Sequence, residues 1–386
     1  MRNWTIALAA LGLTSCATAP AERPLATQSM PRMPVGLDDA GVLFWDQTTR
    51  TDRFRHLEDF YAGQEVTAAA KVRALPRGRA LDAATVAKIE PLLETINAAG
   101  IMVLQDGKVR YEHYRLGFTA QQRWTSFSVA KSFTSTLLGA AVKDGALSLS
   151  DPVTKHLPGL AGTAYDGVTV EQVATMTSGV KWNEDYTDPR SDVARMLTAA
   201  PVAGEPQSVT YAKTLTREAP AGSKWVYKTL ETNLLGDIVA AATGRSLAEY
   251  AKAKIVDPAG FAGGLFWMTD LTGRNIGGCC LSVRLSDYAR MGQWVMEGAQ
   301  PSVPSDWFAK AATKQADIGA PGYGYGYQWW TNPTGFGAQG IFGQYITIVP
   351  RQRLVIAVVS SHETATGKVL SDARGALWRT VAEGIQ

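Results

Sequence analysis

Two β-hairpin signals at opposite ends of the chain constrain the fold more than any other feature of the sequence. In the first, residues 101–104 and 109–114 are β-rich runs separated by the turn dipeptide Asp106-Gly107, a pattern typical of a tight hairpin. The second hairpin is predicted over residues 345–359. Helix signals dominate the region between them. This order predicts an α/β (α+β) fold with a mainly antiparallel sheet flanked by helices.

The helical middle of the chain, about residues 150–265, is predicted to form an inserted subdomain. Two segments there, beginning at Thr169 and Ser246, have the spacing of helix capping boxes. A composition of 46% hydrophobic and 19% charged residues is typical of a globular protein, and a length of 386 residues fits one large domain with an inserted subdomain as well as two domains. We expect one domain that spans residues 41–386. A further strand is expected over residues 323–330, where aromatic and small residues alternate.

The charge balance argues against a nucleic-acid partner. The chain has 38 Lys and Arg residues against 35 Asp and Glu residues, which gives a formal net charge of +3. No block of basic residues is visible, whereas nucleic-acid binding normally requires a basic patch. No nucleic-acid partner is therefore expected.

The N-terminus has the pattern of an export signal. Arg2 precedes a short apolar stretch that ends in Leu13-Thr14-Ser15-Cys16, and this stretch is too short to span a bilayer. The last four residues resemble the lipobox of bacterial lipoproteins, which implies residues 1–16 as signal and Cys16 as the lipidation site. Residues 17–40 are rich in Pro, Ala and Ser and are expected to form a flexible tether.

The alternative for this segment is an ordinary secretory signal with an incidental cysteine. Both interpretations predict an exported protein, periplasmic or anchored to the outer membrane by lipid. The two remaining cysteines, Cys279 and Cys280, are adjacent. Because neighbouring cysteines rarely fit disulfide geometry, we expect two small buried residues rather than a bridge. A reactive thiol is less favoured, since no histidine pattern accompanies it.

A candidate catalytic pair lies at the start of a predicted helix. Ser128 and Lys131 are three residues apart, so their side chains share one helix face. A serine hydroxyl becomes a good nucleophile only when a neighbour accepts its proton. A lysine amine can do so if desolvation lowers its pKa. The spacing is the S-x-x-K pattern of penicillin-binding proteins and serine β-lactamases.

The chain contains this pattern twice, and the sequence context separates the two copies. After Ser128, apolar residues recur with helical period until Gly145, so Lys131 is expected to be desolvated. Ser178 and Lys181 are instead followed by a polar stretch that is predicted to be a loop. We therefore favour Ser128 as the nucleophile. The alternative for either serine is a helix N-cap beside an exposed lysine.

The second proton carrier is expected to be a tyrosine. None of the four histidines lies in a recognisable motif, and the chain has no G-x-S-x-G nucleophile elbow. Tyr227 directly precedes an apolar helical run, and an adjacent ammonium would stabilise its phenolate. The alternative for Tyr227 is a buried ring with a bonded hydroxyl. No metal and no cofactor are expected.

Several runs together resemble the class C β-lactamase-like serine hydrolases, and within them the nylon-oligomer (6-aminohexanoate-dimer) hydrolase branch. The resemblance extends from about Phe44 to the final helix. The runs that carry it are Ser128–Ser132, Thr175–Gly179, Asn183–Pro189, Tyr227 with its following helix, and Gly340–Gln344.

The resemblance implies a β-lactamase/transpeptidase-like fold and assigns roles to residues. Ser128 corresponds to the nucleophile, Lys131 to its proton acceptor, and Tyr227 to the acid/base that protonates the leaving group. The backbone N–H groups of Ser128 and Ile341 correspond to the oxyanion hole. A second set of residues corresponds to substrate-binding positions: Tyr186, Trp330 and Gly340.

Two departures from the class C pattern bear on the substrate. Thr229 stands where the Tyr-x-Asn motif has its asparagine. Ala338-Gln339-Gly340 replaces the Lys-Thr-Gly strand motif, whose lysine grips a β-lactam carboxylate. Both departures resemble the esterase and amidase branches. The tryptophan pair Trp329 and Trp330 alternates faces, so one of the two is expected to belong to the core.

The sequence thus predicts a serine hydrolase that cleaves a small ester or amide through an acyl-enzyme. Two alternatives remain open. One is a weak β-lactamase or D-Ala-D-Ala peptidase acting on the cell wall. The other is a non-catalytic envelope-binding protein that kept the fold, because a fold does not fix a function.

Overall fold

The computed structural model describes residues 41–385, and its largest element is a fully antiparallel seven-stranded sheet. The predicted signal segment, the tether and Cys16 lie outside the described residues. Across the sheet the strands are β3 (Lys108–Tyr114), β2 (Ala98–Gln105), β11 (Leu354–Ser360), β10 (Gln344–Val349), β9 (Gly335–Gly340), β8 (Trp330–Asn332) and β7 (Gly324–Tyr325).

Both predicted hairpins are confirmed, and they meet at the centre of the sheet. Asp106 and Gly107 have φ angles of 52° and 71°, which is the pattern of a type I′ turn. Strands β10 and β11 form the second hairpin, joined by residues 350–353. Strand β2 pairs directly with β11. The two ends of the domain are therefore hydrogen-bonded to each other, with the helical region inserted between them.

The prediction of one strand over residues 323–330 is wrong, because the chain turns in the middle of this segment. Residues 324–325 form β7 and Trp330 begins β8, and these two short strands pair with each other. Between them the N–H of Gly326 donates to the carbonyl of Trp329 at 2.8 Å, and Gln328 has a φ of 60°. The alternation of aromatic and small residues therefore marks a tight hairpin rather than one strand.

A second, four-stranded sheet was not predicted from the sequence. Its strands are too short to give a periodic signal. In order across the sheet they are β1 (Gly63–Val66), β5 (Leu265–Met268), β6 (Leu281–Val283) and β4 (Trp124–Thr125). This sheet leads directly into the predicted nucleophile, since β4 ends three residues before Ser128.

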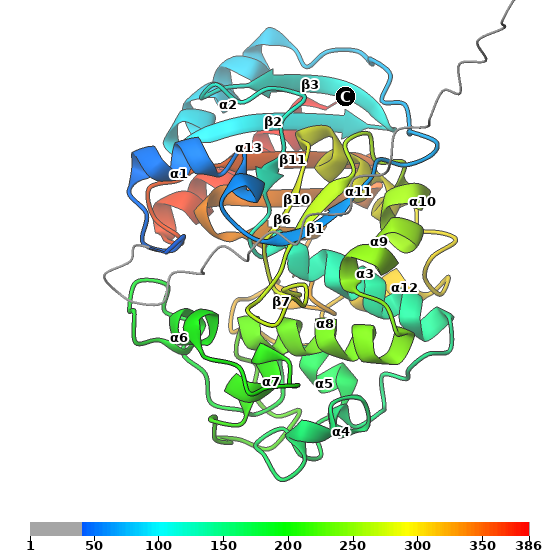
Figure 1. Cartoon of the computed structure of the whole chain (residues 1–386). Helices are drawn as coiled ribbons and strands as arrows, with labels where there is room; N and C mark the ends of the chain where they lie inside the picture. The colour runs from blue at the N-terminus through cyan, green and yellow to red at the C-terminus, as the bar shows by residue number, and fades with distance from the viewer. Residues whose placement is uncertain (1–40, 386) are drawn as a thin grey trace, which may run out of the picture.

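Helices cover both faces of the large sheet (Figure 1). On one face, α2 (Ala83–Thr95) and α13 (Lys368–Gly384) pack over alternate strand residues such as Ile101 and Val103. On the other face, α11 (Leu285–Met296) contacts β2, β10 and β11. Burial on both sides explains why these strands are apolar along their whole length.

The helical region lies on the far side of the central helix α3 (Val129–Lys143), which is buried along most of its length (Figure 1). Helix α8 (Thr229–Thr243) packs beside α3. Capping boxes at Thr169 and Ser246 are confirmed. The remaining helices are α1 (Gln47–Arg53), α4 (Val153–His156), α5 (Val170–Ala174), α6 (Asp192–Thr198), α7 (Gln207–Ala212), α9 (Leu247–Ala251), α10 (Asp257–Ala259) and α12 (Trp307–Ala311).

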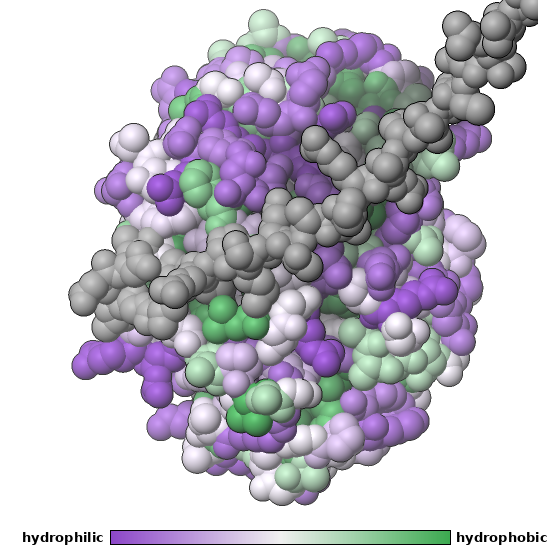
Figure 2. Space-filling model, in the orientation of Figure 1, coloured by the Kyte–Doolittle hydropathy of each residue, from purple (hydrophilic) through white to green (hydrophobic). Residues whose placement is uncertain are grey.

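The surface in the view of Figure 2 is mainly hydrophilic, with apolar residues in small separate patches. Within residues 41–385, no helix combines the length and the apolar character needed to span a membrane.

Candidate active site

Ser128 occupies the N-terminal end of α3, and the structure brings Lys131 to it. The N–H groups of residues 129, 130 and 131 donate to the carbonyls of residues 126, 127 and 128, which starts the first turn. This turn places the Lys131 Nζ 3.1 Å from the Ser128 Oγ. Ser128 as a whole is 8% exposed, and it lines a cavity. A proton acceptor therefore lies within hydrogen-bond distance of an accessible nucleophile.

Burial lowers the pKa of the Lys131 amine, which favours a role as proton acceptor. The side chain is 1% exposed, and desolvation lowers its pKa to about 7, against the smaller opposing effect of the Glu184 charge. Its Nζ also donates to the Thr229 Oγ1 at 3.0 Å and to the Gly278 carbonyl at 2.7 Å. A large fraction of the amine is therefore neutral at physiological pH, where it can accept a proton.

Tyr227 lies two residues before the first residue of α8 and faces the same pair. Its ring centre is 5.2 Å from the Lys131 Nζ, and its hydroxyl interacts with that of Ser128. Burial and the Glu184 charge raise the pKa of Tyr227 far above its ordinary value, against the small opposing effect of Ser128. The raised pKa favours the protonated phenol over the phenolate, and a protonated phenol is the form that can donate to a leaving group.

Glu184 is a site residue that the sequence analysis missed. One carboxylate oxygen accepts from the Tyr186 hydroxyl at 2.7 Å, and the other accepts from the Thr229 N–H at 2.9 Å. The Thr229 hydroxyl also donates to this carboxylate while it accepts from Lys131. The sequence signal that could have identified Glu184 is its position two residues before Tyr186, a candidate site residue.

Gly340 brings strand β9 against the backbone of the nucleophile. A Cβ atom at Gly340 would lie 2.6 Å from the Ser126 carbonyl oxygen and 3.1 Å from the Ser128 nitrogen. Only glycine allows this approach. Ile341 follows directly and lines the same cavity as Ser128. The structure therefore places the two candidate oxyanion-hole residues close together, at the end of β9 and the start of α3.

Left-handed backbone conformations concentrate here. Phe127, directly before the nucleophile, has a φ of 42°, and Phe342, directly after Ile341, has a φ of 60°. Such conformations cost about 1–3 kcal/mol each for residues other than glycine and persist where the surrounding structure enforces them. The two rings contact each other with centres 5.2 Å apart. Packing of these rings therefore helps to hold both sides of the candidate oxyanion hole.

The second S-x-x-K copy is part of the core. Ser178 is fully buried, and its hydroxyl donates to the Glu231 carboxylate. That carboxylate also lies 3.5 Å from the Lys228 Nζ, with neither side chain exposed. Lys181, by contrast, is exposed. The serine thus satisfies a buried charge and has no access to a substrate.

The aromatic residues of the site divide into two groups. Tyr186 lines the cavity beside Ser128. Trp330 is not among the residues that line the cavity; it stacks on Tyr227 with ring centres 5.5 Å apart and planes at 22°. Trp329 is fully buried, so the expectation that one of the pair belongs to the core is confirmed.

The cavity at Ser128 has a volume of about 360 Å³ and mainly apolar walls. Its lining includes helix α6 and the segment 41–44. Among the described residues that line it, Arg190 and Arg195 are the charged ones, and both are exposed. Among residues 41–385, no group of three or more His, Cys, Asp or Glu side chains could hold a metal ion.

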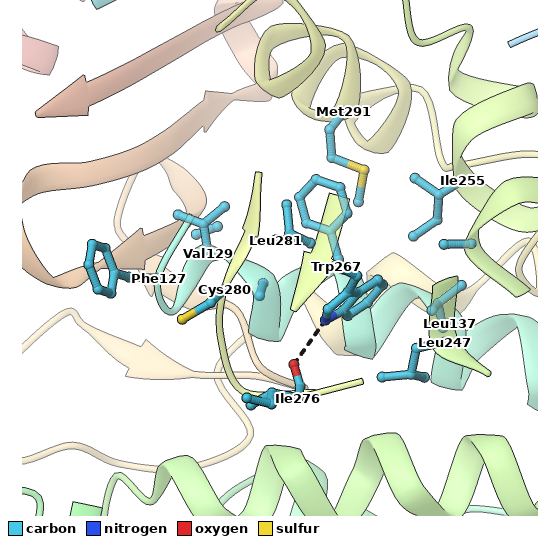
Figure 3. Close-up of a cluster of buried hydrophobic side chains, with 14 of the residues drawn as sticks. Phe127, Val129, Leu137, Leu247, Ile255, Trp267, Ile276, Cys280, Leu281 and Met291 are labelled. Carbon is cyan, nitrogen blue, oxygen red and sulfur yellow. Dashed lines mark hydrogen bonds between the residues drawn. The ribbon is translucent and has the colours of Figure 1, made fainter. Parts of the chain in front are cut away.

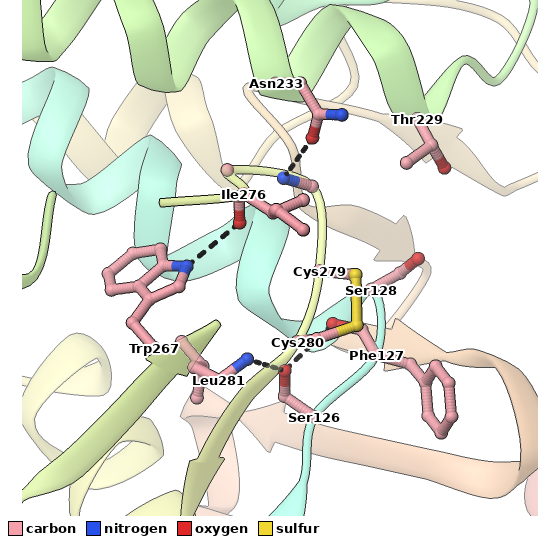
Figure 4. The surroundings of a disulfide bond; sticks show 12 residues. Ser126, Phe127, Ser128, Thr229, Asn233, Trp267, Ile276, Cys279, Cys280 and Leu281 are labelled. Atoms are coloured by element: carbon pink, nitrogen blue, oxygen red, sulfur yellow. Dashed lines mark hydrogen bonds between the residues drawn. A yellow bond between two sulfur atoms is a disulfide. The ribbon is translucent and has the colours of Figure 1, made fainter. Parts of the chain in front are cut away.

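The expectation of two separate cysteines is wrong: Cys279 and Cys280 form a disulfide (Figure 4). The expectation assumed ordinary backbone, whereas Cys280 has a φ of 83°. Both residues line the cavity with Ser128. Cys280 also joins the core around Trp267, whose indole N–H donates to the Ile276 carbonyl at 2.9 Å (Figure 3).

The sequence is similar to known hydrolases over most of its length. Residues 86–270 match the β-lactamase family. The chain is 31% identical over 297 residues to a 6-aminohexanoate-dimer hydrolase from Paenarthrobacter ureafaciens, covering 71% of this chain and 75% of that protein. A β-lactamase from Pseudomonas fluorescens is 35% identical over 100 residues, or 24% of this chain and 28% of that protein.

Solved structures show the same fold. One described as a 6-aminohexanoate-dimer hydrolase from Bacillus anthracis superposes with a TM-score of 0.79 at 21% identity, covering 90% of this chain and 97% of the other. A class C β-lactamase in complex with cefoxitin gives a TM-score of 0.58 at 17% identity, covering 78% and 97%. The expected β-lactamase/transpeptidase-like fold is thereby confirmed.

Proposed function

Because this chain belongs to the β-lactamase family of serine hydrolases, we propose that it hydrolyses small amides or esters through an acyl-enzyme on Ser128. One observation carries the proposal. The Ser128 hydroxyl faces a cavity while a buried amine of lowered pKa lies 3.1 Å from it. This arrangement of a nucleophile and a proton acceptor supports catalysis over binding alone.

The proposed reaction uses Lys131 and Tyr227 as a complementary pair. The neutral Lys131 amine takes the Ser128 proton as the Oγ attacks the substrate carbonyl carbon. The N–H groups of Ser128 and Ile341 stabilise the resulting oxyanion. The Tyr227 phenol gives its proton to the leaving nitrogen or oxygen as that bond breaks, and the Lys131 ammonium reprotonates the phenolate. Water, deprotonated in turn by Lys131, attacks the acyl carbon. The bond to the Ser128 Oγ breaks, this oxygen takes the proton back from the Lys131 ammonium, and the acid is released.

In this proposal, Glu184 stabilises the stage of the cycle in which Lys131 is an ammonium. Its negative charge favours the ammonium form of Lys131, which forms when the amine takes the serine proton. The carboxylate reaches the amine through the Thr229 hydroxyl, which donates to Glu184 and accepts from Lys131. We assign Glu184 and Thr229 as positioning residues, since neither exchanges a proton with the substrate.

The cavity favours a substrate with an apolar chain and a negative end. Its walls are mainly apolar, and the two charged residues in its lining are arginines at the exposed rim. The relative from Paenarthrobacter is named for the 6-aminohexanoate dimer, an amide between unbranched aliphatic chains. We therefore propose aliphatic amides and esters that end in a carboxylate. The test is a matched series of linear amides with carboxylate, neutral or ammonium ends, assayed on the wild type and on the double variant R190A/R195A.

The central experiment is acylation by an activated 4-nitrophenyl ester, followed by intact mass. The wild type is expected to gain one acyl group, and Ser128→Ala is expected to gain none and to lose about 10⁶-fold in turnover. Ser178→Ala is the matched control and should still be acylated. An acyl group on Ser178, or acylation of the Ser128→Ala variant, would overturn the assignment.

A β-lactamase or D-Ala-D-Ala peptidase is the second candidate, favoured by the family match over residues 86–270. The residue pattern weighs against it, because Ala338-Gln339-Gly340 offers no lysine to bind a β-lactam carboxylate. Turnover of nitrocefin faster than that of the aliphatic esters would favour this candidate instead.

We also propose that the protein is exported and anchored through a lipid on Cys16. The disulfide between Cys279 and Cys280 supports export, because disulfides persist mainly in oxidising compartments. A Cys16→Ala variant should lose incorporation of labelled fatty acid and fractionate away from membranes. Equal membrane association of variant and wild type would argue for an ordinary secretory signal or none.

A further inference from the structure

The segment between β5 and β6 forms one wall of the active site and supplies two of its hydrogen-bond acceptors. The Gly277 carbonyl accepts from the Thr134 hydroxyl at 2.7 Å, and the Gly278 carbonyl accepts from the Lys131 Nζ at 2.7 Å. Both donors lie on α3. The orientation of the catalytic amine therefore depends on where this segment places the Gly278 carbonyl.

Glycine is required at both positions. A Cβ at Gly277 would lie 2.3 Å from the Thr232 carbonyl oxygen, and one at Gly278 would lie 2.8 Å from the Asn233 Oδ1. The Gly278 N–H donates to this same Asn233 oxygen at 2.8 Å (Figure 4). Two consecutive glycines give the backbone more freedom than any other dipeptide. Something beyond the glycines themselves must fix the direction of the Gly278 carbonyl.

The disulfide follows immediately and supplies this restraint. Cys279 is bonded to Cys280, and Cys280 has a φ of 83°, a conformation that a free cysteine rarely adopts. On its far side, the Leu281 N–H donates to the Ser126 hydroxyl at 3.1 Å. The segment is thus held at Gly278 by Asn233 of helix α8, at Leu281 by Ser126, and between them by the covalent ring.

We infer that the Cys279–Cys280 disulfide positions Lys131 for catalysis, through the Gly278 carbonyl, and that the hydrolase works at full rate only with this bond closed. The inference rests on the function proposed above. Reduction by a dithiol transfers two electrons and two protons to the sulfurs; the S–S bond breaks, two thiols form, and the dithiol closes to its own disulfide. Half-buried Cys279 lines the cavity, so a small dithiol can reach the bond.

The experiment compares oxidised and reduced full-length protein in burst kinetics with a 4-nitrophenyl ester. Treatment with dithiothreitol is expected to add two free thiols by mass and to lower the acylation rate constant about 10- to 100-fold, because small misplacements of a catalytic group have effects of this size. The ester concentration that gives half-maximal acylation should change little. Reoxidation should restore the rate.

The variant C279S/C280S is the matched control, since it cannot form the bond and retains Cys16. It should acylate as slowly as the reduced wild type and show no response to dithiothreitol. If the variant does not fold, the reversible rate loss of the wild type, with an unchanged circular dichroism spectrum, still tests the inference.

Three outcomes would overturn the inference: full acylation rate after reduction, a change in half-maximal concentration alone, or two free thiols in the untreated protein. The second of these would mean that the disulfide is only a wall of the cavity. Failure of the proposed function can be distinguished from failure of this inference. If the proposed function is wrong, the oxidised wild type would form no acyl-enzyme at all.

Discussion

The Nζ of Lys131 lies 5.2 Å from the ring centre of Tyr227, and burial shifts the pKa values of these two groups in opposite directions. The pKa of Lys131 falls to about 7, and that of Tyr227 rises far above its ordinary value. Above pH 7 the site therefore holds a neutral amine beside a neutral phenol. This is the resting state that an amine base and a phenol acid require, and removal of the Ser128 proton starts from it.

Activity should increase as the pH rises through about 7. The amine of Lys131 is protonated below its pKa of about 7 and can accept the serine proton only above it. We expect kcat/KM for an uncharged ester to fall about tenfold for each unit below the pKa of the base. A variant of exposed Lys181, Lys181→Met, should keep the same profile. A profile that is flat between pH 5 and 8 would contradict this assignment of the base.

Replacement of Tyr227 by phenylalanine should separate amides from activated esters. An amine leaves only when it is protonated, whereas 4-nitrophenolate leaves without a proton, so the loss of a general acid affects the amide far more. We expect amide turnover to fall by about 10²–10⁴-fold, the usual contribution of such a group, with a smaller loss for the ester. Tyr211→Phe is the control, because that hydroxyl donates to Asp192 instead. Equal losses for both substrates would exclude leaving-group protonation by Tyr227.

Glu184→Gln should shift the acidic limb of the pH profile to lower pH. The Glu184 charge raises the pKa of Lys131, so the neutral amide of glutamine leaves that pKa lower than in the wild type. The weaker base should also give a lower plateau rate. Glu218→Gln, which alters a carboxylate paired with Lys224 at the surface, serves as the control. A shift of the limb to higher pH would show that the Glu184 charge does not act on Lys131.

Gly340→Ala should impair catalysis more than a comparable change elsewhere in β9. The added Cβ would lie 2.6 Å from the Ser126 carbonyl oxygen, which forces β9 away from the nucleophile. We expect acylation to fall by about 10²–10³-fold, the cost of losing one oxyanion donor.

Gly337→Ala is the matched control for this prediction. Its Cβ would meet the Ile346 carbonyl oxygen at 2.4 Å, on the same strand but away from Ser128. Both variants should lower the free energy of unfolding in urea by about 1–3 kcal/mol, as crowding in a packed core usually does. Similar acylation rates for the two variants would remove Gly340 from the oxyanion hole.

Local patterns predicted much of the fold because the interactions they describe are local. The Asp106-Gly107 turn and the capping boxes at Thr169 and Ser246 depend on residues a few positions apart. The four-stranded sheet escaped prediction because it pairs β1 with β5, about 200 residues away. The prediction for residues 323–330 was wrong because a period of two is typical of a strand. In the structure, a hydrogen bond between Gly326 and Trp329 closes a turn in this segment.

The sequence by itself determined the pairing of Ser128 with Lys131, because one helical turn fixes residues three positions apart. Only the tertiary structure decided which S-x-x-K copy has access to a substrate, since Ser178 is buried against Glu231. It also decided that burial raises the pKa of Tyr227 and that Cys279 bonds to Cys280. Desolvation and left-handed backbone come from segments distant in the chain, and a local pattern carries no information about them.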